Sequence, residues 1–268
     1  MIVQSTDIGA AKRHARRRRA LTEPRDDVMQ AMAMAGRFMM PAAVASGSGL
    51  TQPDAIFGAL EWWFRADLLT QASGTVSSWT DKSGNARHAT EATNQPAYNA
   101  TGGPLSGPCV TGDGTNDKLG FSWTRASPGT QPFYVWMIAK QITWTNNDSF
   151  MGDSNCVIFQ RTTTPSVAAK CSTQSPLNGA ATIGSWFRFE AQFGNSGADY
   201  FRIGGTTVTQ IMGNVAGGGT WQLFASGAST LFANVAICEA FCFLGVASSG
   251  QRASADAYCD GTYGGGLT

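Results

Sequence analysis

Two short polar stretches hold most of the side chains in this sequence whose types suit catalysis or metal binding. They are 79-WTDKSGNARHAT-90 and 113-DGTNDKL-119. A catalytic site needs a base or nucleophile beside a partner that orients it, and no such partner can be identified in the first stretch. Asp81 is instead placed to accept backbone N–H groups from the residues that follow, Gly84 supplies a positive φ, and Asn85 tolerates the left-handed region. The first stretch therefore predicts a sharp turn after a strand.

Nucleophilic and zinc chemistry are disfavoured by the small number of histidines, which are His14 and His88. A serine nucleophile in 152-GDSNC-156 would need a histidine base, and no Gly-x-Ser-x-Gly motif is present. The cysteines form no CxxC pair, so no zinc signature can be assembled. They are Cys109, Cys156, Cys171, Cys238, Cys242 and Cys259. We expect buried, reduced thiols, as in a protein assembled in cytoplasm.

The composition predicts a β protein. Charged residues make up only 14% of the chain, and 32 glycines accompany many serines, threonines and asparagines. Such a chain favours short strands and tight turns over charged helices. The 268 residues are enough for a sizeable core. We expect one large domain from residue 54 to residue 268, preceded by an arm over residues 1–53.

Short aromatic and β-branched segments separated by turn residues predict the strands of a sandwich. The expected strands cover 57–66, 75–81, 132–140, 155–160, 185–193, 200–205, 207–211, 220–226 and 232–245. In 185-SWFRFEAQF-193 the alternation predicts one buried face and one wet or half-wet face. The segment 204-GGTT-207 predicts a hairpin, and 248–264 predicts a helix capped by Ser248 or Ser249.

The arm has a charge of its own. Residues 1–40 hold eight Lys and Arg against four Asp and Glu, whereas the rest holds eleven against fourteen. After the basic run, 26-DDVMQAMAMAGRFMM-40 predicts a short Met-rich helix that ends at Pro41. Soft methionine side chains suit an adaptable contact surface. The residues expected to anchor a partner through this arm are Arg13, Arg16, Arg17, Arg18, Arg19, Met32, Met34, Phe38 and Met39.

Two alternatives for the arm remain. The Met-rich helix fits a protein partner, which we favour, whereas the arginines fit electrostatic binding of nucleic acid equally well. The helix could also pack on its own domain. The sequence shows neither a signal peptide nor an apolar run long enough for a membrane span, so no membrane partner is expected.

The order of motifs in the body resembles a known superfamily. The segment 60-LEWWFRAD-67 precedes 76-VSSWTDKSGNARHAT-90, and 113-DGTNDKL-119 and 132-PFYVWMIAK-140 follow; a strand leading into a short helix closes the chain. This succession over residues 55–265 resembles the concanavalin A-like lectin/glucanase superfamily, and within it the laminin G-like domains of bacterial and phage proteins. The resemblance implies an all-β jelly-roll sandwich of two antiparallel sheets, here with an N-terminal arm and a short C-terminal helix. Gly112 departs from the family pattern, which usually has an aromatic residue there.

The resemblance also implies a candidate metal site. Members of the superfamily sometimes hold Ca²⁺ at a place like 113–119, and Asp113, Asn116 and Asp117 offer the hard oxygen ligands that calcium prefers. The alternative is a simple turn with Asp113 and Gly114 at its apex. No other cofactor is expected.

Catalysis by glycoside hydrolysis needs a pair of carboxylates. Glucanases of the superfamily carry theirs as Glu-x-Asp-x-(x)-Glu on one strand, and none of Glu61, Glu91, Glu190 and Glu239 stands in that pattern. A sialidase-type Asp box is absent as well, because Ala216 stands four residues before Thr220-Trp221. The sequence therefore predicts that the chain is not an enzyme.

Tryptophans suggest glycan binding, because exposed rings stack on sugars. Most of the eight tryptophans fall in expected strands, where burial in the core is the commoner fate. Trp123 and Trp144 lie near strand ends or loops and are the candidate glycan-binding residues.

Taken with the resemblance, these features predict a non-catalytic virion structural protein of a bacteriophage, such as a capsid-decorating, head-fibre or tail-associated subunit. Residues 1–45 would bind other virion proteins and the sandwich would be displayed, with assembly in the host cytoplasm and a possible homo-oligomer. One alternative is a lectin-like module that binds host or surface glycans. Another is a jelly-roll shell protein whose arginine-rich arm binds the genome.

Overall fold

The computed structural model of the chain describes residues 50–268 apart from 70–73, 129, 173–176, 195–198, 210–211, 214, 218, 228 and 268. The basic run with Arg13 to Arg19 and the expected helix with Met32 to Met39 lie outside these described residues. Everything below concerns the described part.

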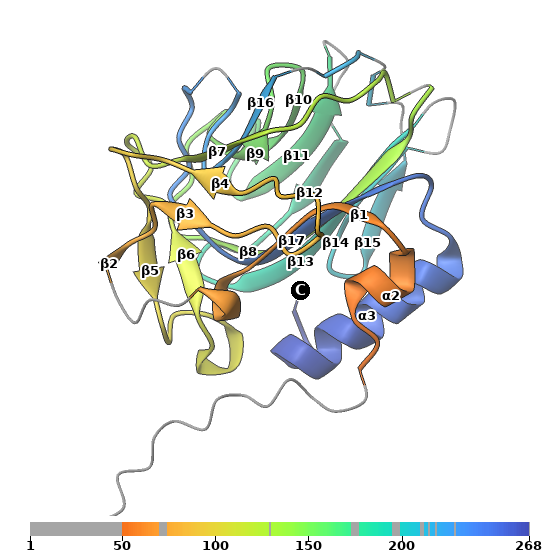
Figure 1. Cartoon of the computed structure of the whole chain (residues 1–268), viewed down its shortest axis with the longest axis horizontal. Helices are drawn as coiled ribbons and strands as arrows, with labels where there is room; N and C mark the ends of the chain where they lie inside the picture. Colours follow the sequence, from red (N-terminus) through yellow and green to blue (C-terminus); the bar gives the residue numbers. More distant parts are fainter. Residues whose placement is uncertain are drawn as a thin grey trace, which may run out of the picture. The chain divides into compact units, whose positions relative to one another are not determined.

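The described part forms two sheets, in which all strand pairs are antiparallel (Figure 1). The first sheet runs in the order β15 (Thr206–Thr209), β14 (Tyr200–Ile203), β13 (Trp186–Phe193), β8 (Phe133–Gln141), β17 (Val235–Leu244), β6 (Cys109–Thr111), β5 (Ala97–Asn99) and β2 (Gly74–Thr75), and β1 (Leu60–Arg65) also pairs with β17. The second sheet runs in the order β12 (Leu177–Ala180), β11 (Ser166–Cys171), β10 (Cys156–Gln160), β9 (Ser149–Gly152), β16 (Thr220–Leu223), β7 (Leu119–Ser122), β4 (Ala89–Thr90) and β3 (Ser78–Trp79). The expected all-β sandwich of two antiparallel sheets is confirmed.

The main core lies between the inner faces of the two sheets. Strand alternation supplies it, because every second residue of a strand points to the same face. On β13 the buried set is Phe187, Phe189, Ala191 and Phe193. Tryptophans from both sheets meet in the core, and the ring of Trp62 from the first sheet lies 6.2 Å from that of Trp221 from the second.

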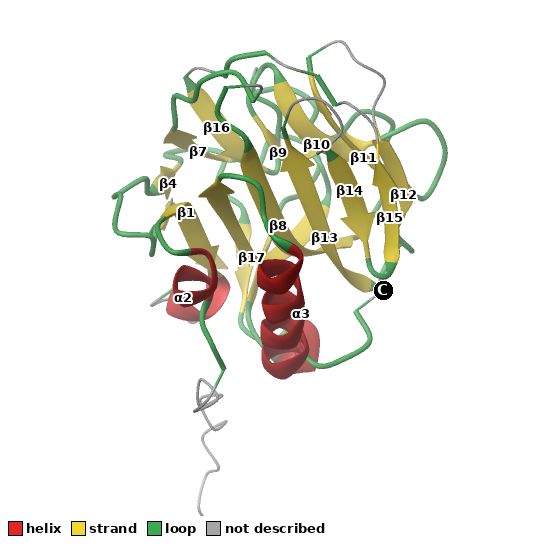
Figure 2. Cartoon of the chain, turned by 90° about the vertical axis from the view of Figure 1, so that its right-hand side faces the viewer, coloured by secondary structure: helices red, strands yellow, loops and turns green. Residues whose placement is uncertain are grey.

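The outer face of the first sheet is covered by the helices α2 (Pro53–Phe57) and α3 (Ser249–Tyr263), which lie side by side (Figure 2). A second apolar cluster fills the space beneath them, with Trp63, Trp136 and Phe241 from the sheet and Tyr258 from α3. The prediction of a wet face on β13 is therefore wrong, because a helix rather than water covers it. Two short 3-10 helices span Ala66–Leu68 and Pro104–Ser106.

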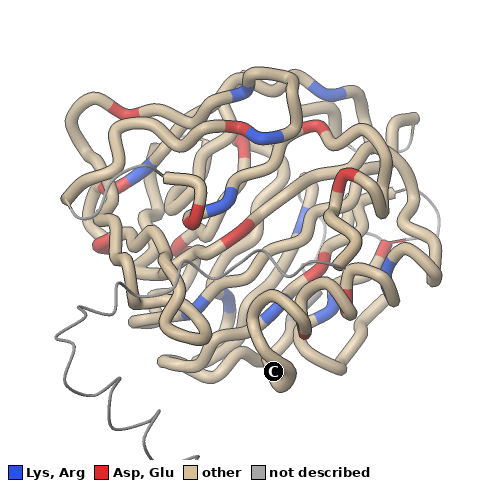
Figure 3. Tube along the Cα trace, turned by 60° about the horizontal axis from the view of Figure 1, so that its bottom comes forward, with Lys and Arg blue, Asp and Glu red and all other residues tan. Residues whose placement is uncertain are grey.

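The predicted helix begins as expected. Ser248 accepts a hydrogen bond from the backbone N–H of Gln251, whose side chain accepts one from the N–H of Ser248, so that the two form a capping box. The predicted hairpin is confirmed too, because Ile203 pairs with Thr206 across the turn at 204–205. No described helix is long and apolar enough to cross a membrane. Acidic and basic positions are sparse and interspersed along the described trace (Figure 3).

Candidate functional site

The outer face of the second sheet is covered by neither α2 nor α3, which both pack on the first sheet. On β10, Cys156 and Ile158 point into the core, so Val157 and Phe159 point outward. Lys170 of β11 pairs with Val157 and faces the same way. Of these side chains, Val157 and Lys170 are half-buried and can be reached by a ligand, whereas Phe159 is only 3% exposed.

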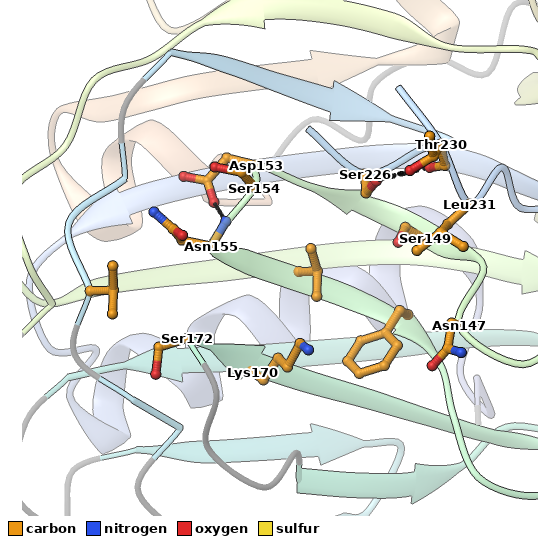
Figure 4. Close-up of a pocket in the computed structure, with 13 residues that line it drawn as sticks. Asn147, Ser149, Asp153, Ser154, Asn155, Lys170, Ser172, Ser226, Thr230 and Leu231 are labelled. Atoms are coloured by element: carbon orange, nitrogen blue, oxygen red, sulfur yellow. Dashed lines mark hydrogen bonds between the residues drawn. The ribbon is translucent and has the colours of Figure 1, made fainter. Parts of the chain in front are cut away.

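A pocket of about 580 Å³ lies on this face, and we call it the β9–β11 pocket (Figure 4). Its volume falls in the range of about 300–1,000 Å³ that is usual for small-molecule sites. The lining residues are Asn147, Ser149, Asp153, Ser154, Asn155, Val157, Phe159, Lys170, Ser172, Val215, Ser226, Thr230 and Leu231. Most of them carry a hydroxyl or amide group.

The turn between β9 and β10 forms one side of the pocket. Asp153 is fully buried, and its Oδ1 accepts the backbone N–H of Asn155 at 2.7 Å. Its Oδ2 forms an ion pair with Arg125 at 3.2 Å, and that arginine side chain is fully buried as well. Asp153 therefore holds the turn, and its charge is neutralised. Ser154 and Asn155 are left at the edge of the pocket.

The loop between β16 and β17 forms a second side of the pocket. Ser226 donates its hydroxyl to the backbone carbonyl of Thr230 at 2.9 Å, and the two hydroxyl oxygens lie 3.3 Å apart (Figure 4). The carbonyl of Leu231 accepts the backbone N–H of Ser149 at 2.8 Å, which fastens this loop to β9. The two sides of the pocket are thus fixed to the same strand by backbone and side-chain bonds.

The floor joins an aromatic ring with a cation. Lys170 Nζ lies 5.3 Å from the centroid of the Phe159 ring, and the guanidinium of Arg161 lies 5.8 Å from the same ring. Such distances are those of cation–π contacts. Arg161 also donates to the side-chain oxygen of Asn147 at 2.9 Å. Phe159 is only 3% exposed beneath these cations, so the accessible apolar surface of the pocket comes from Val157, Val215 and Leu231.

The stretch 79–90 forms the turn that the sequence predicts. Asp81 accepts the backbone N–H groups of Trp63 at 2.8 Å, Ser83 at 2.9 Å and Arg87 at 3.0 Å. Gly84 has φ of 91°. The prediction for Asn85 is wrong, because Ala86 takes the left-handed conformation with φ of 55°.

The polar side chains of this turn hold it to β1. Asn85 donates to the carbonyl oxygens of Leu60 and Glu61, and Arg87 pairs with the carboxylate of Glu61 at 2.8 Å. His88 accepts the backbone N–H of Asp81 through Nδ1 at 3.1 Å.

The stretch 113–119 also forms a hydrogen-bonded turn. Asp113 Oδ1 accepts the backbone N–H groups of Thr115, Asn116 and Asp117 at 2.8, 3.1 and 3.3 Å. Burial acts to raise the pKa of Asp113, but these donors hold it below its usual value. Burial beside Asp113 raises the pKa of Asp117. No set of three or more His, Cys, Asp or Glu side chains in the described part is arranged to hold a metal, and calcium at this turn stays a prediction.

The two tryptophans expected to bind glycans differ in exposure. Trp123 is only 1% exposed, and its indole N–H donates to the half-buried Glu61 at 3.0 Å. The prediction that it stacks on a sugar is therefore wrong. Trp144 is half-buried, donates to the carbonyl of Ser166, and does not line the β9–β11 pocket, so its role stays a prediction.

The cysteines are buried, as predicted, but they are not all reduced. Cys156 and Cys171 stand opposite each other on β10 and β11 and form a disulfide. The prediction of free thiols is wrong for this pair, because strand register brings together two residues that are fifteen positions apart. The other four cysteines are free and buried.

Sequence reasoning missed the pocket as a whole. The segment 152-GDSNC-156, whose serine suggests a nucleophile, lines the site through Asp153, Ser154 and Asn155, which form a structural turn. Nothing in the sequence marked Phe159 or Lys170. The one usable signal was the alternation in 155-NCVIFQ-160, which places Val157 and Phe159 on the face opposite to the core.

Comparisons with known proteins give matches of fold. No protein-family model and no curated protein sequence matches the chain. Among solved structures, the Trypanosoma rangeli sialidase in complex with sialic acid matches with a TM-score of 0.50 and 8% identity, over 78% of this chain and 34% of that chain. A GH54 α-L-arabinofuranosidase soaked with 4-nitrophenyl α-L-arabinofuranoside matches with a TM-score of 0.53 and 14% identity, over 69% of this chain and 50% of that chain. The chain thus spans a third to a half of the length of these proteins, and such identities establish similarity of fold.

These matches correct the functional prediction made from the sequence. The two matching structures named above are glycoside hydrolases, and neither is a phage structural protein. The prediction of a non-catalytic virion protein is therefore wrong, and so is the exclusion of enzymatic activity that it included. The same matches do not favour the lectin-like alternative over the virion prediction.

Proposed function

We propose that the chain is a carbohydrate-active protein whose β9–β11 pocket receives a saccharide. The observation that carries the proposal is the make-up of the pocket, in which hydroxyl and amide groups surround the accessible apolar side chains of Val157, Val215 and Leu231. Saccharides present many hydroxyl groups together with apolar C–H faces. Convergent polar groups around an apolar surface are therefore the chemistry that orients a sugar.

The fold supports the same proposal. The solved structures that share it are named as a sialidase and arabinofuranosidases, with sialic acid or arabinofuranosides bound in several of them. The motif order and the two antiparallel sheets support a finer proposal, that this sandwich is a concanavalin A-like domain of the laminin G-like type.

Binding is the part of carbohydrate chemistry that the pocket geometry supports best. Hydrolysis by the usual mechanism requires two carboxylates about 5–9.5 Å apart at the scissile bond. Among the described lining residues Asp153 is the one carboxylate, and it is committed to Arg125 and to the β9–β10 turn. Cleavage is nevertheless tested with binding, because the similar structures are hydrolases.

The test uses the full chain and a panel of neutral and acidic saccharides, with binding followed by ligand-observed NMR. The matched variants are Val157→Trp, which fills the pocket from β10, and Thr206→Trp, which places the same side chain on an exposed position of β15. We expect Val157→Trp to abolish binding and Thr206→Trp to retain it.

Cleavage is assayed in parallel with 4-nitrophenyl α-L-arabinofuranoside and with an aryl sialoside. If the unmodified chain cleaves a substrate and the Val157→Trp variant does not, the reaction takes place at the pocket. The proposal fails if no saccharide of the panel binds, or if a folded Val157→Trp variant binds as well as the unmodified chain.

A further inference from the structure

The charges around the β9–β11 pocket are not balanced. Lys170 and Asp153 are the charged residues among those that line it. Arg125 neutralises Asp153 at 3.2 Å, and both of these side chains are fully buried. Within the described part, no carboxylate lies within 4.0 Å of Lys170 Nζ. The positive charge of Lys170 therefore faces the pocket without a counter-ion from the described residues.

A second cation adds to the positive charge beside the pocket. Arg161 lies over the same Phe159 ring as Lys170 and is likewise without an ion pair among the described carboxylates. Its hydrogen bond to Asn147 holds it beside a lining residue. Asp148, which follows Asn147 in the sequence, does not line the pocket, and burial raises its pKa.

The neighbouring hollow on the same sheet lacks this imbalance. It has a volume of about 290 Å³ and lies over β4, β7 and β16. Its lysine, Lys118, forms an ion pair with Glu91 at 3.8 Å. Two depressions on one face thus differ in charge, and the larger one carries the unpaired cation.

We propose that the saccharide received by the β9–β11 pocket is acidic, with its anionic group at Lys170 Nζ and its hydroxyls toward the Asn155 and Ser226 sides. This inference rests on the proposed function and narrows its substrate class. A lysine ammonium is a compact point charge with three donors, which suits a single carboxylate or sulfate. A concave site with one sign of charge also concentrates ligands of the opposite sign.

The experiment compares each acidic sugar with an uncharged partner of nearly the same shape. Glucuronate, galacturonate and N-acetylneuraminate are each titrated into the full chain beside their methyl esters, by ligand-observed NMR at low and at 0.5 M salt. Glucose 6-sulfate and galactose 6-sulfate form a separate arm that distinguishes sulfate from carboxylate. We expect at least one acid to bind about tenfold more tightly than its ester, as a charge-assisted bond implies. High salt should remove most of that difference.

Two lysine variants locate the effect. Lys170→Gln keeps the length and polarity of the side chain but removes the charge, and it should bring acid and ester to the same affinity. Lys118→Gln changes the paired lysine of the neighbouring hollow and should leave the tenfold preference intact.

The outcomes separate this inference from the proposal on which it rests. Equal binding of acids and esters, with both lost in Val157→Trp, would overturn the acidic preference and leave saccharide binding in place. An acid preference that survives Lys170→Gln would also overturn the inference. If neither the acids, the esters nor the wider saccharide panel bind, the proposed function fails together with it.

Discussion

Replacing Glu239 by alanine tests how the C-terminal helix is held on the first sheet. Glu239 lies on β17 with no exposed surface, between the sheet and α3. Its carboxylate accepts the indole N–H of Trp63 at 2.5 Å and the hydroxyl groups of Tyr258 at 2.9 Å and Tyr263 at 2.6 Å. Three donors from β1 and α3 therefore converge on one buried acceptor.

The size of the effect follows from the number of donors that would lose their acceptor. Trp63 and Tyr258 are at most 1% exposed, so water cannot replace the carboxylate, whereas Tyr263 is partly exposed. Each buried donor left unsatisfied costs about 1–3 kcal/mol. We therefore expect Glu239→Ala to lower the free energy of unfolding by about 4 kcal/mol, or the melting temperature by about 8–16 °C.

The assay is urea unfolding followed in parallel by tryptophan fluorescence and circular dichroism, since coincident transitions are required for a two-state free energy. Asp260→Ala, which removes an exposed carboxylate from the same helix, is the matched control and should change stability by less than about 0.5 kcal/mol. A loss below about 1 kcal/mol for Glu239→Ala would show that this carboxylate does not fasten α3 to the sheet.

Three further predictions concern other groups. Burial raises the pKa of Asp199 above its ordinary 3.8, so its contribution to stability is complete below pH 3.8 and is lost as pH rises through the folded-state pKa. The slope of unfolding free energy against pH in that window should therefore differ between the unmodified chain and Asp199→Asn; parallel slopes would contradict the shift. Thiol titration of the unfolded, unreduced chain should find four free cysteines, and six after reduction. Replacing Cys156 and Cys171 by serine should cost about 3 kcal/mol, and a titre of six before reduction would rule out the bond. Calcium at 113–119 predicts a lower melting temperature in excess chelator, and an identical melting curve would exclude it.

The sequence predicted the parts of the fold that depend on local pattern. The alternation over 185–193 identified both the strand and its core-facing phenylalanines. The wet face predicted for the same strand was wrong because its cover, α3, is distant in sequence and packs there only in the folded chain. Trp123 was misplaced for a similar reason, since its burial depends on Trp221 and Phe133 arriving from elsewhere.

The candidate site was largely beyond the reach of the sequence. Its two sides come from the β9–β10 turn and the β16–β17 loop, which meet because β16 lies beside β9 in the second sheet. The order of strands in a sheet depends on pairing between residues far apart in the sequence, and a short sequence window does not predict it. The turn of 79–90 was predicted correctly because an Asp followed by Gly acts on its own neighbours.

The described helices cover the first sheet and not the second, and this difference determines which part of the chain unfolds locally first. Strands β8, β13 and β17 lie between the main core and the helices, so their amide hydrogens should exchange slowest, near the free energy of global unfolding. The outer face of the second sheet is covered by neither of the described helices, and its loops are held by a few polar bonds. Substitutions there meet solvent on one side and disturb little packing. The pocket face is therefore the part of this sandwich where the sequence can change most freely while the helix-covered sheet preserves the fold.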